Sequence, residues 1–209
     1  MRNKQHWINE IRLVIFDAYG VLFSRGYPDT AEAVAKKYGL DSKRIFDVLY
    51  TKYFNKAAVR EISQKEAWDL SVRELGLPIS GEELRNLHFS LVRLNNKVRC
   101  FAEGLKKKHT ILMLSKNTRS QFRWLLGAFP VLRKSFGKNI LNTWEYGLPK
   151  AGKETVDFVC KRFRVLPSEI LYIDDQENNL AVPREIGVRT ILYSNFSQFQ
   201  ESFHKIIRQ

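Results

Sequence analysis

Cysteine is scarce in this chain of 209 residues, and its two copies lie far apart. Cys100 and Cys160 form no CxxC pair and have no cysteine or histidine at zinc-ligand spacing. This usage excludes a disulfide-rich secreted scaffold and disfavours a structural zinc site. We therefore expect a reduced protein of the cytoplasm.

Long hydrophobic runs are also missing. No stretch of about 18 apolar residues occurs, so no membrane-spanning helix is expected. The N-terminus, MRNKQHWINEIR, has no apolar run before Leu13, which predicts that a signal peptide is absent. Internal repeats and low-complexity tracts are lacking as well. With 44% hydrophobic residues, the remaining composition is that of a globular protein with a substantial core.

Acidic residues are outnumbered, with 22 Asp and Glu against 35 Lys and Arg, a net charge of +13. The excess lies outside residues 21–92, which are almost neutral. A basic body attracts phosphorylated ligands or nucleic acid, although a lysine-rich solvated surface is the favoured explanation of the charge. The run 106–108 is KKK without interleaved aromatics, which disfavours nucleic acid as a partner. No sequence pattern bears on the oligomeric state.

Four short apolar runs predict buried strands, at residues 13–16, 111–114, 170–173 and 189–193. Helical patterns lie among and between them, at about 97–108, 119–128, 151–163 and 177–186. Strands that alternate with helices are typical of an α/β fold with a parallel sheet. We predict a Rossmann-like core of this class, made of residues 1–20 and 95–209.

The intervening segment, 21–94, has a different pattern. It contains helical patterns at about 29–38, 41–55, 63–76 and 80–93, and no strand-like run interrupts them. It is inserted directly after the first predicted strand. We therefore predict an α-helical cap over the end of that strand.

Polar residues stand at the carboxyl ends of three predicted strands: Asp17, Ser115 and the pair Asp174-Asp175. Each alone is compatible with a helix or turn cap. In an open α/β sheet, however, ligands bind at the edge formed by the carboxyl ends of the strands. Together these residues indicate a candidate active site.

Four segments carry these residues: FDAYGVL at 16–22, LMLS at 112–115, GLPK at 147–150 and YIDDQENN at 172–179. In this order they resemble the four motifs of the haloacid dehalogenase superfamily. Those motifs are an Asp-x-x-Gly-x-Leu loop, a strand ending in Ser or Thr, a lysine, and an acidic pair followed by Asn. The helical insertion, with REIS at 60–63, resembles the helical-cap, phosphatase-like subgroup.

The resemblance implies a Mg²⁺-dependent hydrolase, a phosphatase that acts on a small phosphorylated metabolite through an aspartyl-phosphate. In the family, the residue matching Asp17 is the nucleophile. Mg²⁺ is bound by the residues matching Asp17 and Asp175 and by the carbonyl of the one matching Tyr19. The matches of Ser115 and Lys150 bind the phosphoryl oxygens.

Further roles follow from the same resemblance. Asp174 and Asn179 are expected to orient the site from behind the metal ligands. Lys150 is also expected to offset repulsion between Asp17 and the acidic pair. Tyr19, Arg25, Lys116 and Asn117 are candidate substrate-binding residues.

Two departures from the phosphatase pattern stand out. Tyr19 occupies the position where phosphatases commonly carry a second Asp as general acid and base, and Asp-Ala-Tyr-Gly is also the pattern of 2-haloacid dehalogenases. The usual Ser-Asn of the second motif is replaced by Ser115-Lys116-Asn117. Lys116 therefore either points away from the site or changes its pocket.

Several alternatives follow from these departures. A 2-haloacid dehalogenase is opposed by Asp174-Asp175, because further carboxylates beside Asp17 repel a carboxylate substrate. A catalytically weak or inactive binding protein is a second alternative, and detectable turnover of a phosphate ester would separate it from an enzyme. Residues 147–153 match the GxxxxGK spacing of a P-loop, but Glu154 replaces the hydroxyl residue that such a loop requires.

The substrate itself is not indicated by these motifs. Phe23, Arg25 and Tyr27 follow the nucleophile loop and either face the cleft or pack in a hinge.

Overall fold

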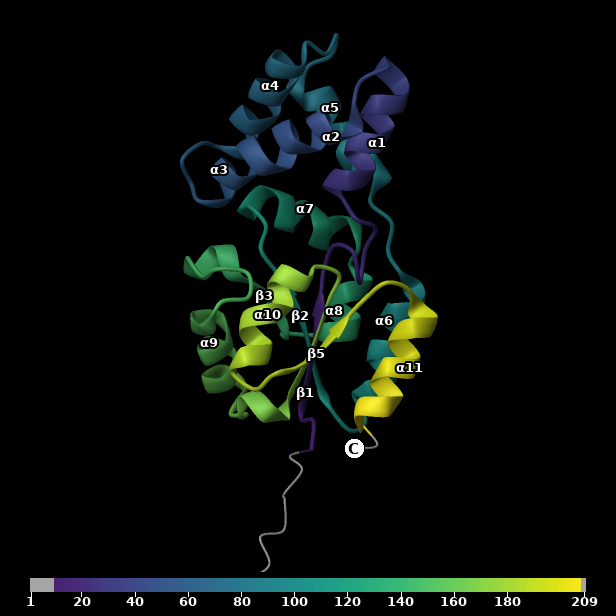
Figure 1. Cartoon of the computed structure of the whole chain (residues 1–209), viewed down its shortest axis with the longest axis vertical. Coiled ribbons are helices and arrows are strands. Elements are labelled where there is room, and N and C mark those ends of the chain that lie inside the picture. The colour runs from purple at the N-terminus through teal and green to yellow at the C-terminus, as the bar shows by residue number, and fades with distance from the viewer. Residues whose placement is uncertain (1–9, 208–209) are drawn as a thin grey trace, which may run out of the picture.

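A computed structural model of the chain describes residues 10–207 (Figure 1). Residues 1–9, which carry the predicted absence of a signal peptide and the start of the predicted core, lie outside the described residues. In the described part, no helix combines the length and the apolar character needed to cross a membrane.

A five-stranded parallel sheet lies at the centre of the larger part of the molecule. Its order is β3-β2-β1-β4-β5. The strands are β1 (Leu13–Asp17), β2 (Thr110–Ser115), β3 (Ile140–Asn142), β4 (Ile170–Asp174) and β5 (Arg189–Leu192). The central strand β1 pairs with β2 on one side and β4 on the other, with Phe16 opposite Met113 and Ile173. The predicted α/β fold with a parallel sheet is confirmed.

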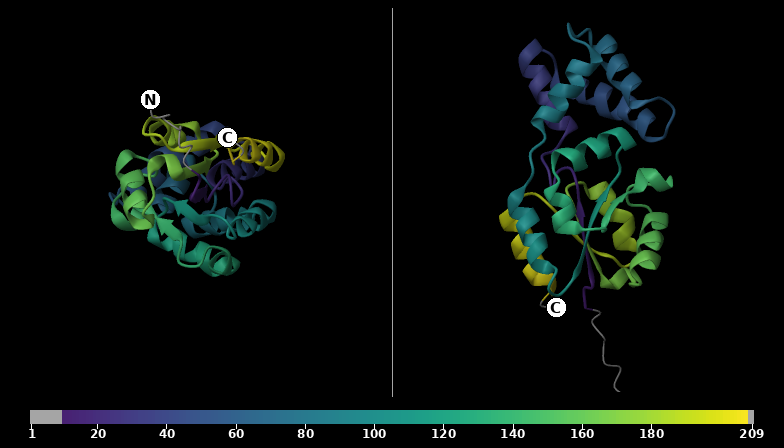
Figure 2. Two further views of the ribbon diagram at one scale, coloured as in Figure 1. Left: turned by 90° about the horizontal axis from the view of Figure 1, so that it is seen from below. Right: turned by 180° about the vertical axis from the view of Figure 1, so that it is seen from behind.

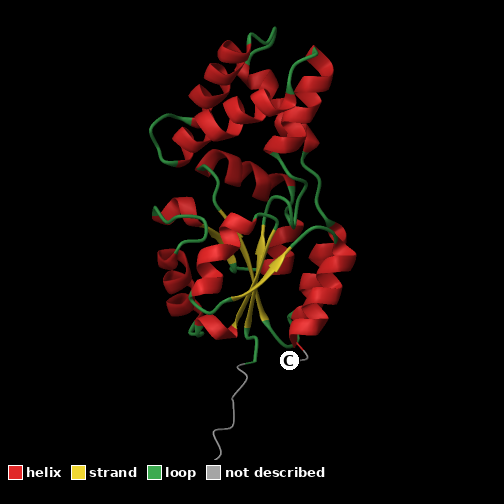
Figure 3. Cartoon of the chain, viewed as in Figure 1, coloured by secondary structure: helices red, strands yellow, loops and turns green. Residues whose placement is uncertain are grey.

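Helices cover both faces of the sheet (Figure 3). Because successive side chains of a strand point to opposite faces, Val14 and Phe16 of β1 pack in one hydrophobic cluster, and Leu13 and Ile15 in another. The first cluster includes side chains of α6 (Asn96–Leu105), α7 (Arg119–Ala128), α8 (Val131–Phe136) and α11 (Phe196–Ile207). The second includes side chains of α9 (Lys153–Phe163) and α10 (Glu177–Glu185). Two short 3₁₀ helices, η2 (Thr143–Tyr146) and η3 (Pro167–Glu169), precede α9 and β4.

The remaining helices gather beyond the carboxyl ends of the strands (Figures 1 and 2). They are α1 (Tyr27–Tyr38), α2 (Ser42–Phe46), η1 (Asp47–Phe54), α3 (Asn55–Ala58), α4 (Gln64–Leu75) and α5 (Gly81–Leu91). Their buried apolar residues, from Tyr27 to Leu84, form a hydrophobic cluster of their own. Capping boxes start α4 at Ser63 and α5 at Ser80, where each serine side chain accepts from the third backbone N–H of its helix. We call α1–α5 with η1 the helical layer.

Residues 42–58 form one continuous helical segment rather than a uniform α-helix. Its middle, η1, is a π-helix between α2 and α3. The predicted helix at 41–55 therefore has the right place but a different hydrogen-bond pattern. Five elements had no sequence prediction: the three-residue strand β3, the 3₁₀ helices η2 and η3, and the helices α8 and α11.

Candidate active site

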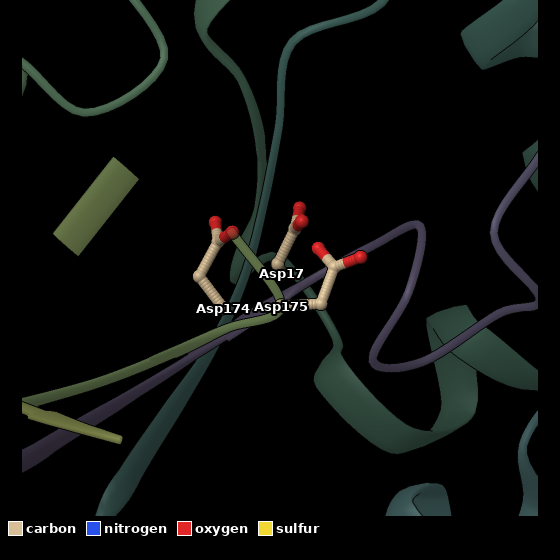
Figure 4. Close-up of side chains that lie close together, drawn as sticks. All are labelled: Asp17, Asp174 and Asp175. Atoms are coloured by element: carbon tan, nitrogen blue, oxygen red, sulfur yellow. The ribbon is translucent and has the colours of Figure 1, made fainter. Parts of the chain in front are cut away.

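Three carboxylates meet at the carboxyl ends of β1 and β4 (Figure 4). Asp17 is the last residue of β1, Asp174 is the last of β4, and Asp175 follows it. One oxygen of each lies within 4.8 Å of the others. Asp17 and Asp174 are buried, and Asp175 is partly exposed. These neighbouring strands place the carboxylates at the edge of the sheet where ligands bind in open α/β folds.

Lys150 supplies a positive charge to this cluster. Its Nζ lies 2.5 Å from Oδ1 of Asp17 and 3.5 Å from Oδ2 of Asp174. Burial lowers the pKa of Lys150, but the carboxylates of Asp17 and Asp174 outweigh it, so the net shift is upward and the ammonium stays charged. The pKa of Asp17 is raised well above its usual value, first by burial and then by Asp174, with Lys150 opposing. One ammonium thus leaves three carboxylates only partly compensated.

The two carboxylates of the acidic pair differ in their partners. Asp174 is saturated, because its oxygens accept from the Gln176 backbone N–H at 2.9 Å, Asn179 Nδ2 at 2.9 Å and the Tyr172 hydroxyl at 2.7 Å. Among the described residues, Oδ1 of Asp175 is buried without a hydrogen-bond partner. Burial and the neighbouring Asp174 raise the pKa of Asp175 to about 6. Asp175 is therefore the carboxylate of the pair with an oxygen free to bind a ligand.

The loop that follows Asp17 runs directly against this acidic pair. Gly20 has a φ of 89°, and a Cβ at that position would collide with the carboxylate of Asp175. Only glycine combines this left-handed conformation with so close an approach. The Asp-x-x-Gly spacing in the sequence therefore reflects contact between the first and fourth motifs.

The end of β2 is fixed by amide side chains. Ser115 Oγ accepts from Asn117 Nδ2 at 2.6 Å. Asn142, at the end of β3, accepts from the Asn117 backbone N–H at 2.9 Å and donates to its carbonyl at 2.8 Å. Because Ser115 Oγ accepts from Asn117, its own proton is available to a ligand. Lys116, which lies between Ser115 and Asn117 in the sequence, also lines the cavity, so it contributes to the pocket rather than pointing away.

A cavity of about 310 Å³ opens above these groups. The sequence-predicted residues that line it are Asp17, Tyr19, Arg25, Ser115, Lys116, Asn117, Lys150 and Asp175. Asp174 and Asn179 lie behind them. Tyr27 also lines the cavity, whereas Phe23 is buried in the core at 2% exposure and packs against Phe129.

Sequence reasoning missed the part of the cavity that the helical layer forms. Pro28, Phe46, Tyr50 and Phe54 line the cavity from α1, α2 and η1, and Gln176 lines it from the loop after β4. The available signal was the spacing of Phe46, Tyr50 and Phe54, four residues apart, which places them on one side of a helix.

Tyr19 joins this cavity to a buried polar network. Burial raises the pKa of its phenol to about 12. Its ring lies against Gly26, where φ is 76° and a Cβ would meet the ring at 2.8 Å. Its hydroxyl is 3.4 Å from Gln121 Nε2. Gln121 Oε1 also accepts from Gln64 Nε2 at 2.7 Å and from the Tyr27 hydroxyl at 3.3 Å.

The same network fixes the protonation of His88. Thr30 donates its hydroxyl to the Gly26 carbonyl at 3.0 Å, so its oxygen accepts from His88 Nδ1 at 2.8 Å. The other ring nitrogen, Nε2, then accepts from Gln121 Nε2 at 3.3 Å. Burial lowers the pKa of His88 to about 3, which keeps the ring neutral. One consistent set of donors therefore links α1, α4 and α5 to α7 and, through Gln121, to Tyr19.

The chain matches the family model of haloacid dehalogenase-like hydrolases over residues 11–187. It belongs to this family. The superfamily membership that the four motifs predicted is confirmed, and the protein is a haloacid dehalogenase-like hydrolase.

Curated and solved relatives agree with this family assignment. D-ribitol-5-phosphate phosphatase of Bacteroides thetaiotaomicron is 23% identical over 94% of this chain and 98% of its own length. A family enzyme from the same species, solved with magnesium and inorganic phosphate, superposes with a TM-score of 0.68 at 18% identity, covering 90% of this chain and 98% of that one. L-2-haloacid dehalogenase of Xanthobacter autotrophicus gives 0.64 at 19% identity, covering 94% and 82%. These structural similarities show a shared fold.

Proposed function

We propose that this hydrolase is a Mg²⁺-dependent phosphatase that transfers the phosphoryl group of a small phosphorylated metabolite to Asp17. The observation that carries the proposal is the cluster of Asp17, Asp174 and Asp175, in which Lys150 compensates only part of the negative charge. Such a cluster calls for a further cation. The similarity to D-ribitol-5-phosphate phosphatase, and to a family enzyme solved with magnesium and phosphate, also supports it.

The residues fit a magnesium site. Mg²⁺ prefers oxygen ligands, and Asp175 has a buried oxygen without a partner beside Asp17. The Tyr19 carbonyl is the third proposed ligand. Asp174, whose oxygens already accept from three groups, would hold the acidic loop in place instead. When bound, the cation would neutralise charge on the phosphoryl oxygens and on the surrounding carboxylates.

The proposed reaction has two displacements at phosphorus. A carboxylate oxygen of Asp17 attacks the phosphorus, the ester P–O bond breaks, and an aspartyl-phosphate forms while the leaving group departs as an oxyanion that takes a proton from water. Water then attacks the phosphorus of that intermediate, which releases inorganic phosphate and restores the carboxylate. Lys150 and the free hydroxyl proton of Ser115 would bind the phosphoryl oxygens and stabilise their charge.

We further propose that residues 21–94 act as a cap, with the helical layer closing the cavity from above. Arg25, at the cavity wall, forms ion pairs with Asp29 at 2.6 Å and Glu32 at 2.8 Å, so its charge is largely compensated. Lys116 has no hydrogen-bond or ion-pair partner within the described part of the chain, and it is the better candidate for a cation that contacts the substrate.

Substitution of the nucleophile tests the proposal. Asp17→Asn keeps the shape of the side chain but removes its nucleophilicity. We expect hydrolysis of p-nitrophenyl phosphate with Mg²⁺ to fall by roughly 10⁴-fold or more, with an unchanged circular dichroism spectrum. The control is Asp157→Asn on α9, an exposed carboxylate paired only with Lys153, which is expected to keep the wild-type rate.

Three outcomes would contradict the proposal. Hydrolysis by Asp17→Asn at the wild-type rate would show that another residue is the nucleophile. Full activity in excess chelator would exclude the metal-dependent mechanism, and halide release from 2-haloacids would then favour a dehalogenase. Failure of the wild type to hydrolyse any phosphate ester would favour a binding protein.

A further inference from the structure

The part of the cavity formed by the helical layer is aromatic. Tyr27, Phe46, Tyr50 and Phe54 line it, and we call these four residues the aromatic wall. Within it, the rings of Phe46 and Tyr50 stack at 5.2 Å and 24°, and those of Tyr50 and Phe54 at 5.3 Å and 12°. Tyr27 packs against Phe54 at 4.7 Å. The four-residue spacing along α2 and η1 thus builds a continuous stack of rings.

The wall lies close to the reacting groups. The pKa of the Tyr50 phenol is raised, chiefly by burial, while Lys150 lowers it and Asp17 raises it, so the phenol lies within electrostatic reach of both. Phe46 and Tyr50 are partly exposed, whereas Tyr27 and Phe54 are buried at 7% and 6% exposure. Phe46 and Tyr50 therefore provide the ring surface that a substrate can touch.

Tyr50 stacks with both Phe46 and Phe54. Phe46 and Tyr50 both line the cavity and keep part of their surface exposed. Edge-to-face and offset contacts are the arrangements that aromatic rings prefer. A planar aromatic group that enters the cavity can make both.

The size of the cavity and the apolar character of the aromatic wall limit the class of substrate further. Its volume of about 310 Å³ is at the small end of the range for ligand sites, roughly 300–1,000 Å³. That volume suits a phosphoryl group with a single ring. A polyol chain would place hydroxyl groups against the aromatic wall, and each hydroxyl that contacts ring carbon there would lose a hydrogen bond to water at a cost in free energy.

The identity of residue 19 independently limits which leaving groups the substrate can have. Tyr19 stands where a carboxyl group would protonate the departing oxygen, and a phenol is a weak acid for that step. A leaving group that departs readily as an anion is therefore favoured. Phenols ionise with a pKa of about 10, far below the value of about 15.7 for water, and so need little protonation.

Building on the proposed phosphatase function, we propose that the substrate class is aryl phosphates with one ring, in which the ester oxygen is attached directly to the aromatic carbon. The aromatic wall binds the ring, and Ser115 and Lys150 bind the phosphoryl group. This chemistry distinguishes the protein from a polyol-phosphate phosphatase.

Three esters of similar size test the aromatic ring and the leaving group separately. Phenyl phosphate has an aromatic ring and a good leaving group, benzyl phosphate has an aromatic ring but an alkyl leaving group, and cyclohexyl phosphate has a saturated ring and an alkyl leaving group. With Mg²⁺ we expect kcat/KM to be highest for phenyl phosphate, by roughly 10²-fold or more over cyclohexyl phosphate. Benzyl phosphate should have a KM roughly 2- to 10-fold below that of cyclohexyl phosphate.

Variants of the aromatic wall test whether its rings cause the lower KM for aromatic esters. Tyr50→Leu is expected to raise KM for phenyl and benzyl phosphate but not for cyclohexyl phosphate, while Tyr50→Phe retains the preference. The control is Tyr38→Leu at the end of α1, a partly exposed tyrosine that does not line the cavity.

The outcomes separate this proposal from the phosphatase function. Three results would each overturn the aryl class. The first is equal kcat/KM for cyclohexyl and phenyl phosphate, and the second is a KM for benzyl phosphate no lower than that for cyclohexyl phosphate. The third is an equal effect of Tyr50→Leu on all three esters. The phosphatase function would then stand, provided that turnover requires Asp17. Absence of Asp17-dependent turnover of every ester would overturn the proposed function itself.

Discussion

At the scale of single residues, the proposed mechanism predicts that Tyr19 limits protonation of the leaving group. Its phenol, with a pKa of about 12, is a weaker proton donor than the carboxyl group that usually occupies this position. We expect kcat/KM to fall steeply as the leaving-group pKa rises in a series of substituted phenyl phosphates at fixed pH. The ring is common to the whole series, so the aromatic wall contributes equally to each member.

The matching variant is Tyr19→Asp, which is expected to flatten that dependence if its carboxyl group reaches the leaving oxygen. General acid catalysis is typically worth roughly 10²–10⁴-fold, so the change should be largest for the poorest leaving groups. A flat dependence in the wild type, with chemistry shown to be rate-limiting, would mean that a different residue donates the proton.

Individual site residues differ in how far the sequence alone predicts them. Asp17, Ser115 and Asp174 follow apolar runs, and a parallel sheet brings the ends of such strands to one edge. Phe23 was open to two interpretations, because a residue just after the nucleophile loop faces either the cavity or the core. It packs in the core against Phe129 and forms a bridge to Leu94, and these are long-range contacts that no local pattern specifies.

At the scale of elements, Gln121 connects the helical layer to α7. It is 1% exposed and its side chain contacts Tyr19, Tyr27, Gln64 and His88. Gln121→Leu would leave buried polar groups of three helices without partners. We expect it to lower the free energy of unfolding by about 2 kcal/mol or more, measured by urea denaturation.

A glutamine outside the network provides the comparison. Gln200→Leu, at a partly exposed position on α11, should change stability by no more than about 0.5 kcal/mol. Equal effects of the two substitutions would show that the network does not stabilise the contact between the helical layer and α7.

The elements also show where sequence patterns stop being informative. Strands β1, β2 and β4 are apolar runs that are buried on both faces, which makes them conspicuous. Strand β3 has three residues and exists only because it pairs with β2. The aromatic wall depends on how α2 and η1 are oriented over the sheet, and helical periodicity fixes which residues share a face but not what that face meets.

At the scale of the whole molecule, stability should depend on pH through His88. Its pKa is about 3 when folded and about 6.5 when unfolded, so the unfolded state binds more protons between these values. The stabilisation is therefore complete above about pH 6.5 and is lost as the pH falls toward 3. From pH 7 to pH 5 we expect the wild type to lose on the order of 2 kcal/mol more than His88→Phe does.

The comparison for that experiment is His204→Phe, which changes an exposed histidine on α11. It should keep the wild-type pH dependence. Parallel pH profiles for the wild type and His88→Phe would show that His88 does not carry the linkage.

Magnesium should also stabilise the folded protein as a whole. A ligand that binds only the folded state at 100 times its Kd adds about 2.7 kcal/mol, so Tm should rise with Mg²⁺ concentration. Asp175→Ala is expected to abolish that rise. Without Mg²⁺ the variant should be at least as stable as the wild type, because one of the mutually repelling carboxylates is gone.

An exposed acidic residue of the neighbouring helix serves as the control. Glu177→Ala removes a carboxylate that pairs with Arg184 and should keep the full magnesium response. A wild-type Tm that does not respond to Mg²⁺ would contradict the metal assignment independently of any activity assay.

The sheet order has a consequence for synthesis on the ribosome. Strand β1 is made first, yet both of its partners, β2 and β4, lie about 100 residues or more further along the chain. The helical layer, in contrast, has its own cluster of apolar residues between Tyr27 and Leu84 and depends on short-range contacts. Local contacts form faster than distant ones. The nascent chain can therefore fold the helical layer while β1, the central strand, is still unpaired. The cluster of Asp17, Asp174 and Asp175 forms only after β4 has been synthesised.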